Sequence, residues 1–320
     1  MLVNNENKTR RIKGLIYGTA LGDAVGGYLE FRTRNAILRD YPTPSDYTFP
    51  PPIEKQVVCK RDTKCLWTDD TNQMLCIIRS LHRTENVVSI QDFAGELYDW
   101  LENGFPEIGQ NSGEGCGGTT FSVIKHPLFK TDPYRASLGI LNNKRSSNGS
   151  IMRTAIMGAR PGDKYQVIQD SICFGSTTHN EFRCNLGCHV ITSIIYDILH
   201  DVDDTTIIQN LYGIVPESYQ SYLTIHHLEE LILDDTHMGY SLKCMAVGVW
   251  AFRQRHRGYK PVILDIILQG GDADTNAAVA GAILGTYYGY NQLPQEWLVN
   301  LRHKEFLDQH YSKFMETISC

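Results

Sequence analysis

Apolar residues recur three and four positions apart along most of this chain, the spacing that gathers them on one face of an α-helix. The pattern predicts helices over residues 11–27, 72–81, 90–101, 166–174, 183–199, 205–211, 242–252, 262–268 and 275–287. Runs of alternating apolar and polar residues, which are typical of strands, are few. Since there is no repeat of fixed period and no linker, we expect one all-α domain over residues 1–320, with 1–10 as a flexible start.

The first predicted helix carries Gly14, Gly18 and Gly22 at every fourth position. A glycine inside a helix costs about 1 kcal/mol relative to alanine unless a close contact offsets the loss. A row of glycines on one face therefore indicates that another helix packs tightly against it.

Two stretches lack a helical pattern. Residues 32–64 contain Pro42, Pro44 and the run 50–52, and a loop this long and rich in proline is often a lid or a binding loop. Residues 103–120 are rich in glycine and polar side chains, so we expect a surface loop there.

Composition narrows the classes of partner and compartment. The chain has 320 residues, 42% of them hydrophobic, which is enough for a large buried core. Its formal charge of −6 provides no basic field for a nucleic-acid backbone, so we expect no general nucleic-acid binding. No stretch approaches the roughly 20 apolar residues that span a bilayer, and the polar start lacks the apolar core of a signal peptide. We therefore expect a cytoplasmic monomer without membrane contact, whose nine scattered cysteines are free thiols.

The most informative polar residues form two short acidic motifs, each preceding an apolar helical run. The motifs are Thr68, Asp69, Asp70 and Thr71, and Gly271, Asp272, Ala273, Asp274 and Thr275. Each supplies two carboxylates and at least one hydroxyl, with no histidine or cysteine between them. Because oxygen ligands select Mg²⁺, Mn²⁺ or Ca²⁺ over zinc or copper, together the motifs predict a site for a hard metal ion.

Each motif alone has a structural alternative, because an acid at a helix start stabilises the first turn by about 0.3–1 kcal/mol. A cap needs only one acceptor, however, and each motif has two acids with flanking hydroxyls. If all four carboxylates meet, each close pair repels by roughly 4 kcal/mol at an effective dielectric of 20, and two divalent ions would balance the four charges. The sequence Asp-Asp-Thr also occurs at 203–205, where we expect a helix start, and at 234–236, where we expect a loop and helix cap.

Five blocks of residues carry a resemblance to a known family. They are residues 18–24 with 29–31, then 68–71, 147–153, 178–179 and 271–275. In order and approximate spacing they resemble the ADP-ribosylglycohydrolase family, over residues 11–290. The resemblance implies an orthogonal helical bundle whose central cleft holds two Mg²⁺ or Mn²⁺ ions. It also implies hydrolysis of the C1″ glycosidic bond between ADP-ribose and an acceptor, on an ADP-ribosylated protein or an ADP-ribose-containing small molecule.

The same resemblance assigns roles to individual residues. The implied metal ligands are Thr68, Asp69, Asp70, Asp272, Asp274 and Thr275. The implied substrate contacts are Asn148, Gly149, Ser150, His179, Gly117, Gly239 and Tyr240. The catalytic candidates are Glu30, Asp69, Asp70 and Asp272. Asp23, inside the glycine-rich helix, is expected to be a buried acceptor that supports the cleft.

These residue types suit the implied chemistry. Cleavage of a ribosyl bond builds positive charge on the sugar and requires an activated water, which a binuclear site can provide. Glu30 or one of the metal-binding acids would take the proton, and the alternative for Glu30 is an ion pair with Arg32 or Arg34. Two other functions remain open: a non-catalytic ADP-ribose-binding or structural descendant of the fold, and a binuclear nucleotide phosphoesterase.

One segment departs from the family pattern. Members that act on ADP-ribosyl-arginine tend to carry Asp-Ile-Gly before the threonine pair that lies at 119–120 in this chain. Here residues 115–118 are Gly-Cys-Gly-Gly, and the nearest acid is Glu114. The missing carboxylate leaves the acceptor open, although Glu114 is close enough to substitute if the loop shifts.

Overall fold

The computed structural model describes residues 2–55, 65–142 and 144–319, and helices account for the fold. The α-helices are α1 (Leu2–Gly26), α2 (Arg34–Asp40), α3 (Asp69–Arg83), α4 (Ile90–Asn103), α5 (Gly118–Ile124), α6 (Pro133–Leu141), α7 (Ile151–Thr154), α8 (Lys164–His179), α9 (Phe182–Leu199), α10 (Asp204–Ile214), α11 (Ser241–Arg253), α12 (Tyr259–Ile267), α13 (Ala273–Tyr288), α14 (Gln295–Leu298) and α15 (Lys304–Ser319). Within the described residues there is no strand, only the two isolated bridges Thr33 with Gly270 and Ser147 with Tyr240. The expected all-α class is confirmed.

Short 3-10 helices connect several of these elements. They are η1 (Pro44–Asp46), η2 (Ile53–Lys55), η3 (Pro106–Ile108), η4 (Ala155–Ala159), η5 (Glu217–Leu223), η6 (Leu228–Leu231), η7 (Arg255–Arg257) and η8 (Tyr290–Gln292). Tight single turns of this kind are common at helix ends and between helices.

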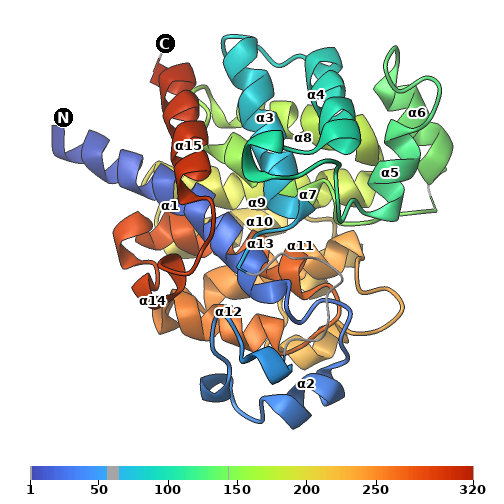
Figure 1. Ribbon diagram of the computed structural model, residues 1–320. Helices are drawn as coiled ribbons and strands as arrows, with labels where there is room; N and C mark the ends of the chain where they lie inside the picture. The colour runs from blue at the N-terminus through green and yellow to red at the C-terminus, as the bar shows by residue number, and fades with distance from the viewer. Residues whose placement is uncertain (1, 56–64, 143, 320) are drawn as a thin grey trace.

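Helices α1 and α13 pack against each other through the middle of the molecule (Figure 1). A Cβ added at Gly18 would lie 2.2 Å from the carbonyl oxygen of Gly281, and one added at Gly22 would lie 2.1 Å from that of Ala277. The close packing predicted from the glycine row is therefore confirmed. Positions in contact fall along α13 as they rise along α1, so the helices are antiparallel. The end of α1 consequently meets the beginning of α13.

Helix α3 begins beside this junction, and most of its residues are buried. Its apolar face supplies Met74, Ile77 and Ile78 to the core, where it packs against α4, α7 and α15. Helices α8 and α9 pack as a pair on the same side of the molecule (Figure 1). The apolar core thus holds the end of α1 and the starts of α3 and α13 close together, although these segments are distant in the sequence.

Several helices were not predicted from the apolar pattern. They are α2, α5, α6, α7, α14 and α15. The expectation of an irregular stretch over 32–64 is wrong for α2, while residues 56–64 of that stretch lie outside the described residues. Helix α1 begins at Leu2, and α5 begins inside the loop expected over 103–120.

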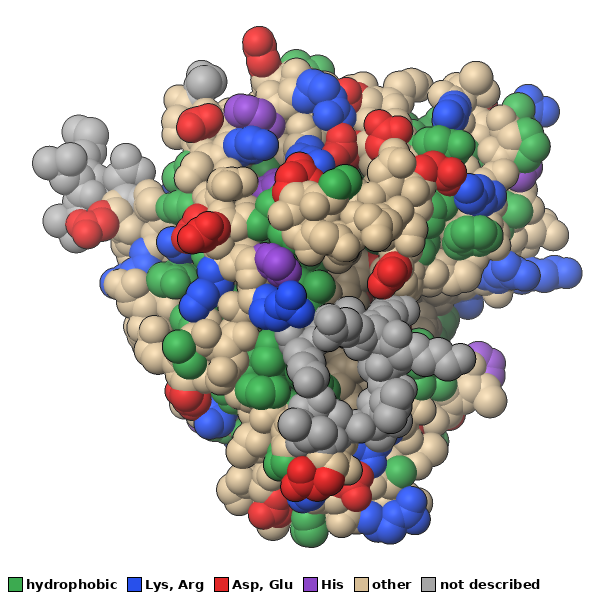
Figure 2. Space-filling model, in the orientation of Figure 1, with side chains coloured by type: hydrophobic (Ala, Val, Ile, Leu, Met, Phe, Trp, Pro, Cys, Tyr) green, Lys and Arg blue, Asp and Glu red, His purple; other side chains and the backbone are tan. Residues whose placement is uncertain are grey.

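The structure also tests the expectations about membrane contact, surface charge and cysteines. None of the helices in the described residues is long and apolar enough to span a membrane. Figure 2 shows acidic and basic side chains interspersed over one face of the molecule. The seven cysteines that the structure describes are free thiols, as expected, and five of them are buried.

Candidate metal centre and cleft

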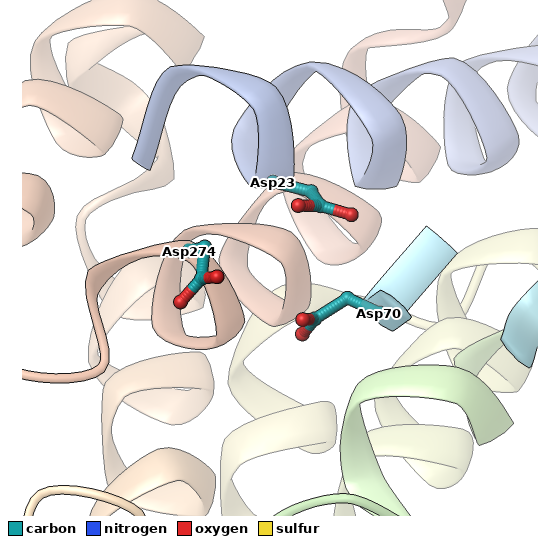
Figure 3. Close-up of side chains that lie close together, drawn as sticks. All are labelled: Asp23, Asp70 and Asp274. Atoms are coloured by element: carbon teal, nitrogen blue, oxygen red, sulfur yellow. The ribbon is translucent and has the colours of Figure 1, made fainter. Parts of the chain in front are cut away.

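Carboxylates from three helix ends converge where α1, α3 and α13 meet. Asp23, Asp70 and Asp274 each offer an oxygen, and these oxygens lie within 4.8 Å of one another. Figure 3 shows the three side chains directed toward a shared space. A second group of the same tightness contains Glu30, Asp272 and Asp274. The two groups share Asp274, so the acidic motifs predicted to meet do lie together.

The first turn of α3 is held by Asp23 rather than by its own acids. The Asp23 carboxylate accepts hydrogen bonds from the Thr68 N–H at 2.9 Å, the Thr71 N–H at 3.0 Å and the Thr71 hydroxyl at 2.6 Å. Thr68 is the N-cap residue of α3, and its hydroxyl accepts from the Asp70 N–H. Because Asp23 already accepts three hydrogen bonds, we assign it the supporting role expected from the sequence.

Asp70 has the environment of a metal ligand. Its side chain is 1% exposed, and its Oδ1 atom is buried without a hydrogen bond of ordinary geometry. The Thr68 hydroxyl donates to Oδ2 at 3.0 Å, and the Thr275 hydroxyl lies close to the same carboxyl group. A buried carboxylate oxygen without a donor is costly unless a cation faces it. This oxygen therefore fits a metal ion.

Burial and mutual repulsion act on the whole cluster. Desolvation, followed by the charges of neighbouring acids, raises the pKa values of Asp69, Asp70 and Asp274 well above the ordinary range. Burial raises the pKa of Asp23 to about 6, although its hydrogen bonds oppose the shift. Bound cations would reverse these shifts, since they favour the charged form of each acid.

The loop that carries Glu30 is tied to the loop that carries Asp272. The Phe31 N–H donates to the carbonyl of Gly271 at 2.7 Å, and the Gly271 N–H donates to the carbonyl of Arg32 at 2.9 Å. Gly271 has φ of +65°, and a Cβ there would lie 1.9 Å from the carbonyl oxygen of Leu233. Glycine is therefore required where this loop presents Asp272.

The two arginines considered as partners for Glu30 have their own acids. Arg32 forms an ion pair with Asp40, and Arg34 forms one with Glu229. Asp272 is the N-cap residue of α13, but its side chain makes no capping hydrogen bond. The structural alternative for Asp272 therefore does not describe this helix start.

A cleft of about 220 Å³ opens over these acids. The predicted site residues that line it are Glu30, Asp69, Asp70, Asp272, Asp274, Thr275, Asn148, Gly149, His179, Gly117 and Gly239. The described lining does not include Thr68, which caps α3, or Ser150, which is buried at the start of α7. Tyr240 likewise lies outside it, at the start of α11.

One wall of the cleft is the segment that leads into α7. The Asn148 amide donates to Oδ2 of Asp272 at 2.7 Å, and its backbone N–H donates to the carbonyl of Gly239 at 3.0 Å. A Cβ at Gly149 would lie 2.9 Å from Cε1 of His179, so the backbone passes directly over that ring. This wall therefore joins the predicted substrate contacts to the metal-binding acids.

The segment that departs from the family pattern also lines the cleft. Gly115, Gly117 and Gly118 line the cleft, and the Gly117 N–H donates to the carboxylate of Asp69. Glu114 is exposed and is not among the described lining residues, so it does not replace the missing acid in this structure. Phe31 also lines the cleft, with its side chain 71% exposed and φ of +60°.

Sequence reasoning missed several residues of this site. Phe31, Ser147 and Met152 line the cleft, and Gln73 and Arg153 lie behind it. A signal was available for Gln73, because it stands four positions after Asp69 and so lies on the same face of α3. Arg153 lies in the block 147–153 that carries the family resemblance, but no role of its own was predicted for it.

Comparison with known proteins agrees with the geometry. Residues 4–319 match the ADP-ribosylglycohydrolase family model. The chain is 24% identical to ADP-ribosylarginine hydrolase Tri1 of Serratia proteamaculans, over 95% of this chain and 78% of that protein. It is 22% identical to the ADP-ribosyl-[dinitrogen reductase] glycohydrolase of Rhodospirillum rubrum, over 92% and 91% of the two chains.

A solved structure supports the fold. The structure described as an ADP-ribosylglycohydrolase-related protein complex superposes with a TM-score of 0.74 at 21% identity, and covers 98% of this chain and 99% of that chain. At this identity the superposition establishes the helical architecture.

Proposed function

The chain belongs to the ADP-ribosylglycohydrolase family, and from that membership we propose that it hydrolyses the C1″ glycosidic bond between ADP-ribose and an acceptor. The observation that carries this proposal is the pair of acidic groups that share Asp274 at the base of one cleft. Such a cluster, in which Oδ1 of Asp70 is buried without a hydrogen bond of ordinary geometry, suits divalent cations and the hydroxyls of a ribose.

The proposed cofactor is a pair of Mg²⁺ or Mn²⁺ ions. Their ligands would come from Asp70, Asp274, Asp272 and Glu30, with hydroxyl oxygens of Thr68 and Thr275 at the edge. When bound, the ions would lower the pKa of an attacking water and neutralise the acids. Asp69 lines the same cleft and is oriented by Gln73 and Gly117, so it would be a further ligand.

The remaining residues position the sugar and the diphosphate. Asn148 is fixed by Asp272 and Gly239, and the Gly149 backbone passes over His179, so this wall presents polar groups at set places. Glu30 lies at the mouth of the cleft, half-buried, where it can take the proton of the attacking water or guard the opening. The metal-binding acids are the other candidates for that proton.

We propose an ADP-ribosylated protein or an ADP-ribose-containing small molecule as the substrate. The name of the Serratia relative specifies ADP-ribosylarginine as its substrate. The name of the Rhodospirillum relative specifies an ADP-ribosylated protein, dinitrogen reductase. In this chain residues 115–118 bring no carboxylate to the cleft. Arginine is therefore one acceptor to be tested beside others.

The decisive experiment compares the native chain with Asp272→Ala on arginine-linked, serine-linked and O-acetyl-ADP-ribose substrates. We expect the native chain with Mg²⁺ or Mn²⁺ to release intact ADP-ribose from at least one, and the variant to fold without turnover. Release of AMP or phosphate would indicate the phosphoesterase instead. No turnover and no ion binding at millimolar concentration would indicate the non-catalytic descendant.

A further inference from the structure

Arg153 is a fully buried cation with no ion pair among the described residues. It lies on α7, and its guanidinium hydrogen-bonds to neutral groups on α3 and α8. Because the guanidinium can only donate, each partner must turn an acceptor toward it. The two side chains bonded to Arg153, Gln73 and Thr178, must therefore each present an oxygen to it.

The first partner, Gln73, connects Arg153 to Asp69. Arg153 donates to Oε1 of Gln73 at 2.7 Å, and Nε2 of the same amide donates to Oδ2 of Asp69 at 2.8 Å. If the amide turned over, its oxygen would face the Asp69 carboxylate and its NH₂ would face the guanidinium, which is repulsive on both sides. Arg153 therefore holds Gln73 in the orientation that fixes Asp69.

The second partner connects Arg153 to the wall of the cleft that contains Ser147 and His179. Arg153 donates to the Thr178 hydroxyl oxygen at 2.7 Å, and this oxygen lies 2.7 Å from Nδ1 of His179. Among the described residues, Nδ1 is the one acceptor recorded for the Thr178 proton. His179 therefore carries its hydrogen on Nε2 and donates it to the Ser147 hydroxyl at 2.9 Å.

The electrostatics agree with this assignment. Burial, and after it the charge of Arg153, lowers the pKa of His179 well below its ordinary value, so the ring is neutral. Since Ser147 accepts from His179 and lines the cleft, its own proton remains to be donated into the cleft. A donor at this place suits an oxygen of the diphosphate or of a ribose.

We propose that Arg153 is a positioning residue that sets two arms of the cleft at once, Gln73 and Asp69 on the metal side, and Thr178, His179 and Ser147 on the substrate side. This inference rests on the proposed function for the nature of the ligands. Arg160 provides a matched control, because it is also a buried arginine but bonds to Asp170 and Asn86, which are not among the described lining residues of the cleft.

The test measures Mn²⁺ and ADP-ribose affinity by calorimetry in Arg153→Lys and Arg160→Lys, with circular dichroism to show that each is folded. A lysine keeps the charge but cannot bond Gln73 and Thr178 together. We expect Arg153→Lys to weaken both affinities by about tenfold or more, the usual effect of removing a group that orients a ligand. Arg160→Lys should change neither affinity by more than about twofold.

Two further variants separate the arms and keep the test valid if Arg153→Lys does not fold. Gln73→Met should weaken Mn²⁺ binding by about tenfold with ADP-ribose affinity nearly unchanged, and Thr178→Val should do the reverse. The role proposed for Arg153 would be wrong if Arg153→Lys folds and keeps native affinities, or if Gln73→Met and Thr178→Val do not affect the two ligands separately. The proposed function would be unaffected by either result. A native chain that binds neither Mn²⁺ nor ADP-ribose would overturn the proposed function together with the role of Arg153.

Discussion

The same tripeptide, Asp-Asp-Thr, begins both α3 and α10, and its acids do different things at the two places. At α10, Asp203 caps the helix by accepting from the Thr206 N–H at 3.0 Å, and Asp204 accepts from Nε of Arg255 at 2.7 Å. At α3, Thr68 and Asp23 hold the first turn, and Oδ1 of Asp70 is buried without a hydrogen bond of ordinary geometry.

A third copy of the tripeptide, at 234–236, behaves like the one at α10. Asp234 accepts from the Arg34 N–H at 2.8 Å, and Asp235 forms an ion pair with Lys243 at 2.8 Å. In both places every acid is matched by a donor or a cation of the chain itself. The expected helix start at 203–205 and the expected loop at 234–236 are confirmed, but the helix cap expected at 234–236 is wrong, because α11 begins later, with Tyr240 as its N-cap residue.

The difference teaches how to separate a structural acid from a ligand. A carboxylate at a helix start is structural when it supplies the cap, as Asp203 does. It is free for chemistry when other residues supply the cap, as Thr68 and Asp23 do for α3. Asp272 meets the same criterion, because it occupies the N-cap position of α13 without making the capping hydrogen bond.

The largest expected effect is on turnover. Asp70→Asn removes a negative charge from the centre of the cluster with little change in shape. The kcat/KM for an ADP-ribosyl substrate should therefore fall more than about a hundredfold, beyond the usual loss when a residue that only orients a metal ligand is changed. Asp204→Asn, the matched change at α10, should leave kcat/KM within about twofold of native. Equal rates for Asp70→Asn and the native chain would place the acids of α3 in the same structural class as those of α10.

The next effect is the stabilisation that a bound ion gives. At a free Mn²⁺ concentration about 100 times the dissociation constant, the native chain should gain about 2.7 kcal/mol in its free energy of unfolding. Thermal melts with and without Mn²⁺ should show this gain for the native chain and for Asp204→Asn. Asp70→Asn should show a much smaller shift, and an undiminished shift would contradict its assignment as a ligand.

A smaller effect appears without metal, and it depends on pH. Because burial and neighbouring acids raise the pKa of Asp70 in the folded state, the folded chain holds a proton that the unfolded chain releases, so stability falls as pH rises from about 4. Asp70→Asn removes this linkage, and in the presence of a chelator it should raise the free energy of unfolding at pH 7 by about 1 kcal/mol after the cost of burying an amide.

The pH dependence provides the control for this third prediction. The gain should fade as the pH is lowered toward 4, where the Asp70 carboxyl of the unfolded chain is also protonated. Urea unfolding of both proteins at pH 4.5 and 7 with chelator measures it. A gain that is constant with pH would have a cause other than the charge of Asp70.

The apolar pattern was sufficient for the long helices but not for the short ones. The sequence predicts α9 and α13 to within a few residues, because each has apolar residues at helical spacing over several turns. Helices α5 and α7 are too short to show a period, and they form because tertiary contacts fix them. Helix α15 had a detectable signal in Phe306, His310 and Phe314, which recur at every fourth position and are buried.

The residues of the site also fall into two groups, those that could be predicted from the sequence and those that could not. The acids could be found from the sequence because two of them stand within three positions of each other before each of two predicted helices, adjacent at 69–70 and separated by Ala273 at 272–274. Their relation to Arg153 could not, because it depends on Gln73 and Thr178 from different helices meeting one guanidinium. Phe31 lies in the resembling block 29–31, but its exposed place at the cleft could not be predicted, since it follows from the backbone hydrogen bond to Gly271.

The smallest expected effect belongs to α10 and completes the comparison. The Asp204 side chain is 33% exposed; it forms an ion pair with Arg255 and accepts a hydrogen bond from the Tyr287 hydroxyl. The ion pair is therefore partly exposed to solvent. Asp204→Asn should therefore lower the free energy of unfolding by less than about 1 kcal/mol. Urea unfolding in low and high salt should show the difference shrinking in high salt, because salt screens the pair in the native chain. A loss of Mn²⁺ affinity in this variant would show instead that the acids at α10 act on the cleft, and the distinction between the two helix starts would fail.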